Sequence, residues 1–394
     1  MQITRRKILS RTCLALCATT LLSSGAVSAR APGAPTQPDG APAGRSVVLP
    51  PAYLMWRSRG LPAGTEPRIR ALAGVSSAVV FLGDTLWMAA SYTRAGAVVA
   101  RIPAPMGVPL EAFAADPSTM SGFIPVAYRS AVLNAMTHGR AVLGARSAKL
   151  RRLGVGDRIV LRSGQPIIVG AVVPDPVASW SELLVSRVAA QRLGITHPQF
   201  ALMAVVGNPT AEQLRRRVVA TLGPGYPVRV RKPGGAVFRR VADTALPPIL
   251  MKLAFGEFVA RPDPARPGYL QMGGSFVRDH LAWGTVPLLG GSTCNRRLFP
   301  PLVAAMNELR AKGLAGLIHG YAGCYSPRNV NRWPTGPISH HAWGAAVDIN
   351  AAQNPWGATP HQDPRLVAIM QAHGFAWGGH FLVPDGMHFD YVGV

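Results

Sequence analysis

ISHHAWGAAVDIN, at residues 338–350, and FAWGGHFLVPDGMHFDY, at residues 375–391, are the two stretches that decide how the C-terminal part of this chain folds. Each contains a segment in which apolar and polar residues alternate, the pattern of a β-strand with one buried face. In the first stretch Val347 belongs to the apolar face and Asp348 to the polar face, and in the second His388 belongs to the polar face. If the two strands are neighbours, Asp348 and His388 share a face.

Histidine is concentrated in this part of the chain, where eight of the ten histidines follow Gly268. A catalytic zinc needs about three protein ligands, from histidine nitrogen or carboxylate oxygen, and one open position for water. His341, Asp348 and His388 meet that requirement. Each also has an ordinary alternative, because a single histidine is usually a surface or hydrogen-bonded residue and a single aspartate at a strand end is usually a turn or cap residue.

A longer motif surrounds these residues. Ser339-x-His341-x-x-Gly344-x-Ala346-x-Asp348 resembles, position for position, the SxHxxGxAxD signature of the peptidase family of D-alanyl-D-alanine carboxypeptidases and L-alanyl-D-glutamate endopeptidases. Downstream, the string DGMH at residues 385–388 is similar to that family's acid-x-x-His element, and VPLLGGSTCNRR and GYAGCYSPR resemble its flanking strings. The resemblance covers roughly residues 269–394.

The resemblance implies a zinc-dependent (Zn2+) metallopeptidase that hydrolyses peptide bonds in peptidoglycan stem peptides. His341, Asp348 and His388 would bind the metal, and Asp385 would be the general base that takes a proton from water. Ser339, which opens the motif, is predicted to contact the substrate. The resemblance leaves open whether the enzyme removes a terminal D-alanine or cuts within the stem.

The sequence departs from the family pattern at two positions. Many members carry an arginine directly after a Ser-Gly-Tyr string to stabilise the oxyanion, whereas Ala322 stands there in this chain. We expect Arg328 to supply the cation instead, with Arg332 as the second candidate. Many relatives also have glutamate in place of Asp385, and the shorter side chain would need a closer approach to the water.

Other residues of the two stretches have structural explanations. His340 adjoins His341, but neighbours in an extended segment point to opposite faces, so we expect a structural or substrate-facing role. His380 lies either in the cleft wall or at the surface. Trp343 and Trp377 are expected in the core or in the cleft wall.

The start of the chain is typical of an exported protein. Residues 1–29 place basic residues before a short apolar run and end in small residues, so we predict a signal peptide cleaved after Ala29, by either the general or the twin-arginine route. Residues 30–49, rich in Pro, Ala and Gly, are predicted to be a disordered spacer. The mature protein would lie in the periplasm, outside the cell or in the wall, without a transmembrane span.

Residues 50–235 are predicted to form a separate, basic α+β domain, because short apolar runs alternate there with helix-like stretches such as residues 181–195 and 210–223. Residues 141–173 resemble the periplasmic domain of MacB-type transporter permeases, which implies an interaction module. Only His138 and His197 occur in the domain, without paired acids, so the sequence shows no catalytic cluster there.

The remaining boundaries follow from composition and periodicity. Pro-rich residues 236–268 are predicted to link the basic domain to a zinc peptidase domain at 269–394. That last domain is predicted as α+β, a small antiparallel sheet backed by helices within residues 298–313 and 364–374. Cys294 and Cys324 are the two cysteines left after signal removal, and in an oxidising compartment they are expected to pair, the alternative being two buried thiols.

The formal charge of +23 limits the class of partner. From Gly268 onward, eight Lys and Arg face six Asp and Glu, so almost all of the excess precedes that residue. For an exported protein such a surface favours an anionic wall polymer, lipid headgroups or an envelope protein over nucleic acid, the alternative being an arginine-rich composition without a specific partner.

Two other functions fit the same sequence. One is a zinc-bearing binding module without hydrolytic activity, and the other is a regulated peptidase that docks on an envelope transporter complex. Asp385 distinguishes the first of these from an enzyme, because a module that only binds has no need of an acid beside the metal.

Overall fold

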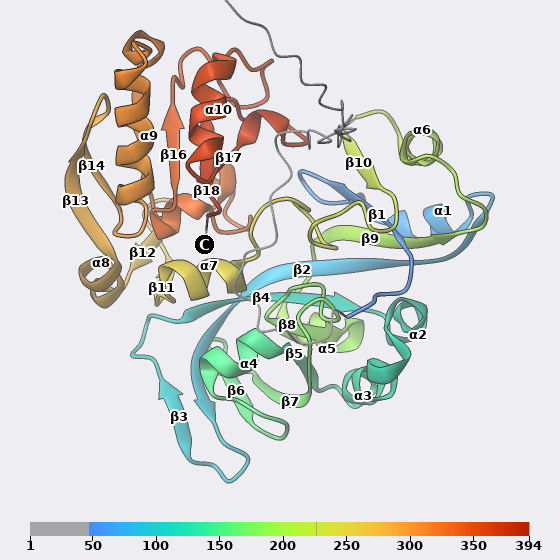
Figure 1. Cartoon of the computed structure of the whole chain (residues 1–394). Helices are drawn as coiled ribbons and strands as arrows, with labels where there is room; N and C mark the ends of the chain where they lie inside the picture. Colours follow the sequence, from blue (N-terminus) through green and yellow to red (C-terminus); the bar gives the residue numbers. More distant parts are fainter. Residues whose placement is uncertain (1–46, 226, 394) are drawn as a thin grey trace, which may run out of the picture. The chain divides into compact units, whose positions relative to one another are not determined.

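The computed structural model describes residues 47–225 and 227–393 (Figure 1). The predicted signal peptide and most of the predicted spacer lie outside the described residues. The described part has the predicted α+β class: a large mixed sheet occupies residues 53–231, and a small antiparallel sheet occupies residues 321–391. Within this part, no helix combines the length and apolar character needed to cross a bilayer.

The large sheet is partly closed on itself. Its order is β10-β1-β9-β2-β4-β8-β5-β7-β6, with β3 paired to β2. The 18-residue strand β2 pairs with β4 along one part and with β6 along another, which closes six of the strands into a barrel-like ring. The strands are β1 (Tyr53–Arg57), β2 (Val75–Tyr92), β3 (Val98–Arg101), β4 (Val108–Ala115), β5 (Ala141–Gly144), β6 (Arg158–Leu161), β7 (Pro166–Val173), β8 (Leu183–Ser186), β9 (Pro198–Val205) and β10 (Val228–Arg231).

Apolar alternation explains the strands of the ring. In β7, Ile167 and Val169 are buried while Ile168 and Val172 between and beyond them are exposed, as expected for a strand with one face toward a core. The helices of this region are α1 (Thr65–Arg70), α2 (Pro117–Met120), α3 (Val126–Thr137), α4 (Ala145–Arg151), α5 (Arg187–Leu193) and α6 (Ala211–Leu222).

The two predicted helical stretches of this region had different outcomes. The helix predicted within residues 210–223 is present as α6, and Thr210 and Gln213 form a capping box at its start. The prediction for residues 181–195 was wrong in its first half, which forms strand β8 before α5 begins at Arg187. All four residues of β8 are buried between β4 and β5, and a short, mostly apolar run has no periodicity that separates a buried strand from a helix.

Residues 236–268, predicted as a linker, contain helix α7 (Pro248–Phe255) and strand β11 (Ala260–Pro262), which pairs with β12 (Leu270–Met272). Phe255 and Phe258 are buried in one apolar cluster with Trp343. Lys252 of α7 donates to both carboxylate oxygens of Glu182, at 2.8 and 2.9 Å. The segment therefore packs against its surroundings on both sides, while the domain boundaries themselves stay predictions.

The small sheet has the order β15-β16-β18-β17, with antiparallel neighbours. Helices α9 and α10 cover it, as predicted: their leucines and methionines share a buried cluster with Val347 and Phe389 (Figure 1). The remaining elements are α8 (Gly274–His280), β13 (Leu281–Val286), β14 (Gly290–Asn295), α9 (Phe299–Ala311), β15 (Tyr321–Gly323), β16 (Ala346–Ile349), α10 (Pro364–Ala372), β17 (Phe375–Trp377) and β18 (His388–Tyr391).

The predicted disulfide between Cys294 and Cys324 is present, and it joins β14 to the residue that follows β15. Replacing both cysteines with alanine is expected to lower the free energy of unfolding by about 3 to 4 kcal/mol, because the bond closes a loop of about 30 residues in the unfolded chain. Denaturant titration measures this loss. The reduced wild-type protein should show a similar decrease, and an unchanged unfolding midpoint in the double variant would contradict the prediction.

Candidate metal centre

The site is built first on two adjacent strands. Strands β16 and β18 are antiparallel neighbours with Asp348 opposite His388, so the prediction that these two residues share a face is confirmed. His388 Nδ1 lies 3.0 Å from Asp348 Oδ1. Both side chains are largely buried, with 11% of His388 and 13% of Asp348 exposed, which keeps the pair beneath the surface of the small sheet.

A tight turn supplies the third residue. His341 belongs to the 3-10 turn η4 (His340–Trp343), and Ser339 caps this turn by accepting a hydrogen bond from the His341 backbone N–H at 3.4 Å. Gly344 ends the turn with a φ of 65°, and a Cβ there would meet the backbone nitrogen of Asn295 at 2.6 Å. The motif therefore needs glycine at this position for both conformation and close packing.

The turn brings His341 to the other two residues. His341 Nε2 lies 3.2 Å from Asp348 Oδ2 and 3.2 Å from His388 Nδ1. Among the described residues, His341, Asp348 and His388 form a group that can hold a metal ion, with one ligand atom from each residue lying within 4.8 Å of the others. Zinc bonds of about 2.0–2.2 Å at tetrahedral angles separate ligand atoms by about 3.3 Å, so this donor set fits a zinc ion with one position left open.

The far side of each imidazole ring is also fixed. His341 Nδ1 lies 2.7 Å from the carbonyl oxygen of Cys324, and His388 Nε2 lies 2.8 Å from Asp390 Oδ1. A ring nitrogen that donates to such an oxygen leaves the lone pair of the other nitrogen free for a metal. Both rings therefore turn their second nitrogen, Nε2 of His341 and Nδ1 of His388, toward Asp348.

His340 has a separate role. Its Nδ1 lies 3.0 Å from Asp390 Oδ1 and its Nε2 lies 3.2 Å from the carbonyl oxygen of Leu246, so it buttresses Asp390. In agreement with the prediction, His340 is not part of the group of candidate metal ligands. The predicted reason, an extended segment, was wrong. The segment is a 3-10 turn and not an extended strand, so His340 and His341 diverge because of the turn.

The carboxylates and imidazoles of the site shift one another's pKa values. Burial alone would raise the pKa of Asp348, but hydrogen bonds from His341 and His388 hold it well below its usual range. Burial also opposes ionisation of Asp390, and the charges of His340 and His388 outweigh it, so the pKa of Asp390 is low as well. Burial opposes a charged His388, yet Asp390 and Asp348 raise its pKa. Both carboxylates are therefore held as anions, the form that binds cations.

A cleft of about 520 Å³ opens beside these residues, and Asp385 and Arg328 both line it. The buried Oδ1 of Asp385 has no hydrogen-bond partner among the described residues, and burial raises the pKa of its carboxyl group. Burial lowers the pKa of the Arg328 guanidinium, and the charge of Asp348 opposes that change. An arginine side chain stays charged at neutral pH, so the cleft contains a cation and a carboxylate whose Oδ1 has no partner among the described residues.

The other predicted residues are placed as follows. Arg332 lines the cleft, and its Nε donates to the Tyr269 hydroxyl at 2.7 Å. Trp343 is fully buried in the core. Trp377 donates from Nε1 to the Gly386 carbonyl at 2.8 Å, and His380 packs edge-on against its ring. Among the described residues that line the cleft, His380 does not occur.

Sequence reasoning missed several cleft residues. Trp56 of β1 and Arg229 of β10 line the cleft, although both come from the large sheet. Tyr325 and Asn331 line it as well, and burial raises the pKa of Tyr325 to about 12, so its phenol stays neutral. No motif marks the first two, while Tyr325 stands inside the flanking string GYAGCYSPR and could have been named from it.

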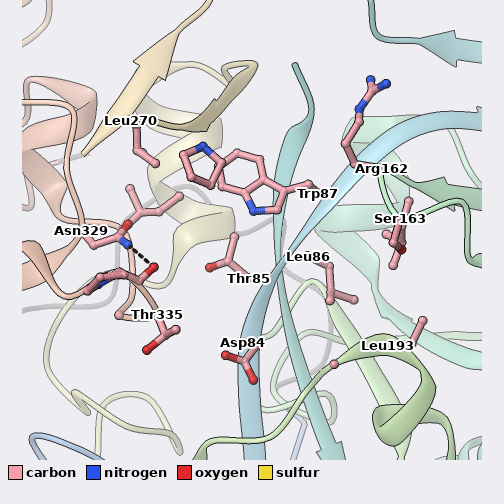
Figure 2. Close-up of a pocket in the computed structure, with 16 residues that line it drawn as sticks. Asp84, Thr85, Leu86, Trp87, Arg162, Ser163, Leu193, Leu270, Asn329 and Thr335 are labelled. Atoms are coloured by element: carbon pink, nitrogen blue, oxygen red, sulfur yellow. Dashed lines mark hydrogen bonds between the residues drawn. The ribbon is translucent and has the colours of Figure 1, made fainter. Parts of the chain in front are cut away.

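A second, smaller pocket of about 270 Å³ lies between strand β2 and residues 329–338 (Figure 2). Figure 2 shows Asp84 and Trp87 of β2 on one side and Asn329 and Thr335 on the other. The Asn329 amide donates to the carbonyl oxygens of Trp333 and Pro334, at 2.8 and 3.1 Å. This pocket includes none of the three candidate metal ligands.

Comparison with known proteins separates the two parts of the chain. Residues 333–391 match the family model described as D-alanyl-D-alanine carboxypeptidase, which confirms the resemblance predicted from the motif. The matched segment contains His341, Asp348, Asp385 and His388. Over these residues the chain is therefore similar to that peptidase family. No curated protein matches the chain.

Two solved structures are weakly similar to the chain. The periplasmic region of MacB from Actinobacillus actinomycetemcomitans has 8% sequence identity and a TM-score of 0.31, and the match covers 46% of this chain and 88% of that one. The extracellular domain of the noncanonic ABC-type transporter YknZ from Gram-positive bacteria has 10% identity and a TM-score of 0.31, with 46% of this chain and 100% of that one covered. The expected resemblance is found, but likeness at this level carries no argument about function.

Proposed function

We propose that the chain is a zinc-dependent peptidase that hydrolyses peptide bonds in the stem peptides of peptidoglycan. One observation carries the proposal: the donor atoms of His341, Asp348 and His388 converge beside a cleft that also contains the unpartnered carboxylate of Asp385. All four residues belong to the segment that matches the carboxypeptidase family model.

When bound, zinc would polarise the scissile carbonyl group and lower the pKa of a water molecule. In this proposal Asp385 accepts the proton of the attacking water and later gives it to the leaving amine. Its Oδ1 has no hydrogen-bond partner among the described residues, so no other protein group there occupies the lone pairs of this oxygen. The burial that raises its pKa brings proton affinity closer to what a base needs near neutral pH.

We assign Arg328 the role of stabilising the oxyanion that forms during hydrolysis. It lines the cleft and lies close enough to Asp348 and Asp385 for their charges to affect its pKa, so a guanidinium is held near the position where negative charge would develop. Ser339 caps the turn that carries His341, so we assign it a positioning role beside its predicted contact with the substrate. Asp390 and the Cys324 carbonyl oxygen orient the two histidine rings.

We also propose that the protein is exported from the cytoplasm. The disulfide between Cys294 and Cys324 supports an oxidising compartment, where stem peptides are found. An anionic wall polymer or an envelope protein as partner of the basic region at residues 50–235 stays a prediction.

Digestion of purified muropeptides, followed by mass spectrometry, tests the proposal. We expect loss of a terminal D-alanine if the enzyme is a carboxypeptidase. If it is an L-alanyl-D-glutamate endopeptidase, we expect cleavage of the bond between the L-alanine and the D-glutamate of the stem. The Asp385→Asn variant serves as the control and should leave the muropeptides intact. Unchanged muropeptides with the zinc-loaded wild-type protein would contradict the proposal and favour the alternative of a zinc-bearing binding module.

A further inference from the structure

One wall of the cleft is built from outside the segment that matches the peptidase family. Trp56 of β1 and Arg229 of β10 line the same cleft as His341 and Asp385, although they belong to the large sheet. The Arg229 guanidinium lies over the Trp56 ring, 5.7 Å from its centroid, and Arg229 Nη2 donates to the carbonyl oxygen of His380 at 3.2 Å. These contacts fix the guanidinium at the edge of the candidate active site.

The charge of Arg229 is incompletely balanced. Its Nη1 lies 3.8 Å from Oδ1 of the fully buried Asp243, too far for a hydrogen bond. The other oxygen, Oδ2, accepts a hydrogen bond from Arg231 Nε at 2.6 Å. Two guanidinium groups therefore share one carboxylate. One positive charge remains beside the cleft, where it can pair with an anionic group of a ligand.

Two residues that line the cleft each carry a buried donor without a partner among the described residues. Trp56 is 7% exposed, and its indole Nε1 makes no hydrogen bond to any described residue. The Nδ2 of Asn331, which also lines the cleft, is likewise buried without a partner among the described residues. A buried donor left unpaired costs free energy, so a cleft with such donors is suited to a ligand that brings oxygen acceptors.

From these contacts we infer that Arg229, Trp56 and Asn331 form a subsite for a carboxylate-bearing part of the substrate, away from the bond that is cut. Arg229 pairs with the carboxylate, and the indole and amide N–H groups donate to oxygen atoms of the same part of the peptide. The inference rests on the proposed function for the identity of the ligand, an acidic peptide. It makes the large sheet a participant in substrate recognition.

The chain offers a matched control for Arg229. Arg231 lies two residues away on the same strand, contacts the same Asp243 and is not among the described residues that line the cleft. With a stem peptide that carries a free side-chain carboxylate, Arg229→Gln is expected to raise KM about 10- to 100-fold with kcat little changed, since it removes a charged hydrogen bond made equally in ground and transition states. Arg231→Lys, which keeps a positive charge beside the buried Asp243, should leave KM within about threefold.

The same peptide with its carboxylate converted to a primary amide identifies the group that Arg229 binds. The wild-type enzyme should prefer the acid over the amide, and Arg229→Gln should abolish that preference. Trp56→Phe, which keeps an aromatic ring and removes the N–H donor, should raise KM for both peptides about 2- to 10-fold. Equal KM values for the acid with the wild-type enzyme, Arg229→Gln and Trp56→Phe would overturn the inference.

A binding measurement separates this inference from the proposed function. In the Asp385→Asn background, the fluorescently labelled acidic peptide should bind about 10- to 100-fold more weakly when Arg229→Gln is added. If the wild-type protein cleaves no peptide but binding still depends on Arg229, the proposed function fails and the subsite stands. If cleavage is normal but binding is the same with and without Arg229→Gln, the subsite is refuted and the peptidase stands. A protein that neither binds nor cleaves the peptide refutes both.

Discussion

Replacing His341 with alanine is expected to remove bound zinc and, with it, measurable peptidase activity. The substitution leaves Asp348 and His388, and two ligands cannot hold a catalytic zinc. The loss of affinity should exceed the factor of about 10 to 100 that is typical when a residue behind a ligand is removed. Metal content after dialysis against a low concentration of zinc, measured by mass spectrometry of the metal, tests this result. His388→Ala should behave in the same way.

A histidine outside the group provides the control. His380 packs against Trp377 and is not among the described residues that line the cleft, so His380→Ala should retain a full complement of zinc. Thermal unfolding of each variant shows whether it is folded. Full metal content in a folded His341→Ala or His388→Ala protein would show that these residues are not the ligands.

Asp385→Asn is expected to retain zinc and to lower kcat by a factor of about 10² to 10⁴, the range for removal of a general base. The substitution keeps the size of the side chain but removes its ability to accept a proton. Asp385 is not one of the three grouped ligands, so metal content should stay at the wild-type level. Steady-state kinetics and metal content, measured on the same preparation, test both parts of the prediction.

Asp390 is the informative comparison, because its side chain contacts His388 although it is not one of the three grouped ligands. It accepts from both His388 Nε2 and His340 Nδ1, so its removal should disturb the orientation of a ligand. We expect Asp390→Ala to weaken zinc affinity by about 10- to 100-fold and to recover most of its activity at saturating zinc. An active Asp385→Asn enzyme beside a zinc-loaded but inactive Asp390→Ala enzyme would reverse the two assignments.

The residues at the centre of the candidate site could be named from the sequence because short local patterns mark them. Alternation placed Asp348 and His388 on one face of neighbouring strands, and the motif added His341 and Asp385. The path of the chain at His341 could not be read in the same way. The turn depends on Gly344 and on its contact with the backbone of Asn295, which lies about 50 residues earlier in the sequence.

Residues far from the motif could not be predicted, because tertiary packing alone brings them to the cleft. Trp56 and Arg229 have ordinary strand patterns, and nothing in those patterns indicates which surface their strands will meet. Residues 236–268 illustrate a related difficulty. Proline suggested a linker, whereas Phe255 and Phe258 within the segment are buried against Trp343, and only the packed structure shows that partner.

Removal and return of the metal tests the central claim most directly. The wild-type protein should be stripped of metal with a chelator, dialysed and titrated with zinc while cleavage of a stem peptide is measured. We expect the stripped protein to be inactive and activity to rise in proportion to added zinc until about one ion per chain is bound, as a site with three protein ligands and one open position requires. A stripped protein that cleaves the peptide as fast as the untreated one would contradict the assignment of a catalytic zinc centre.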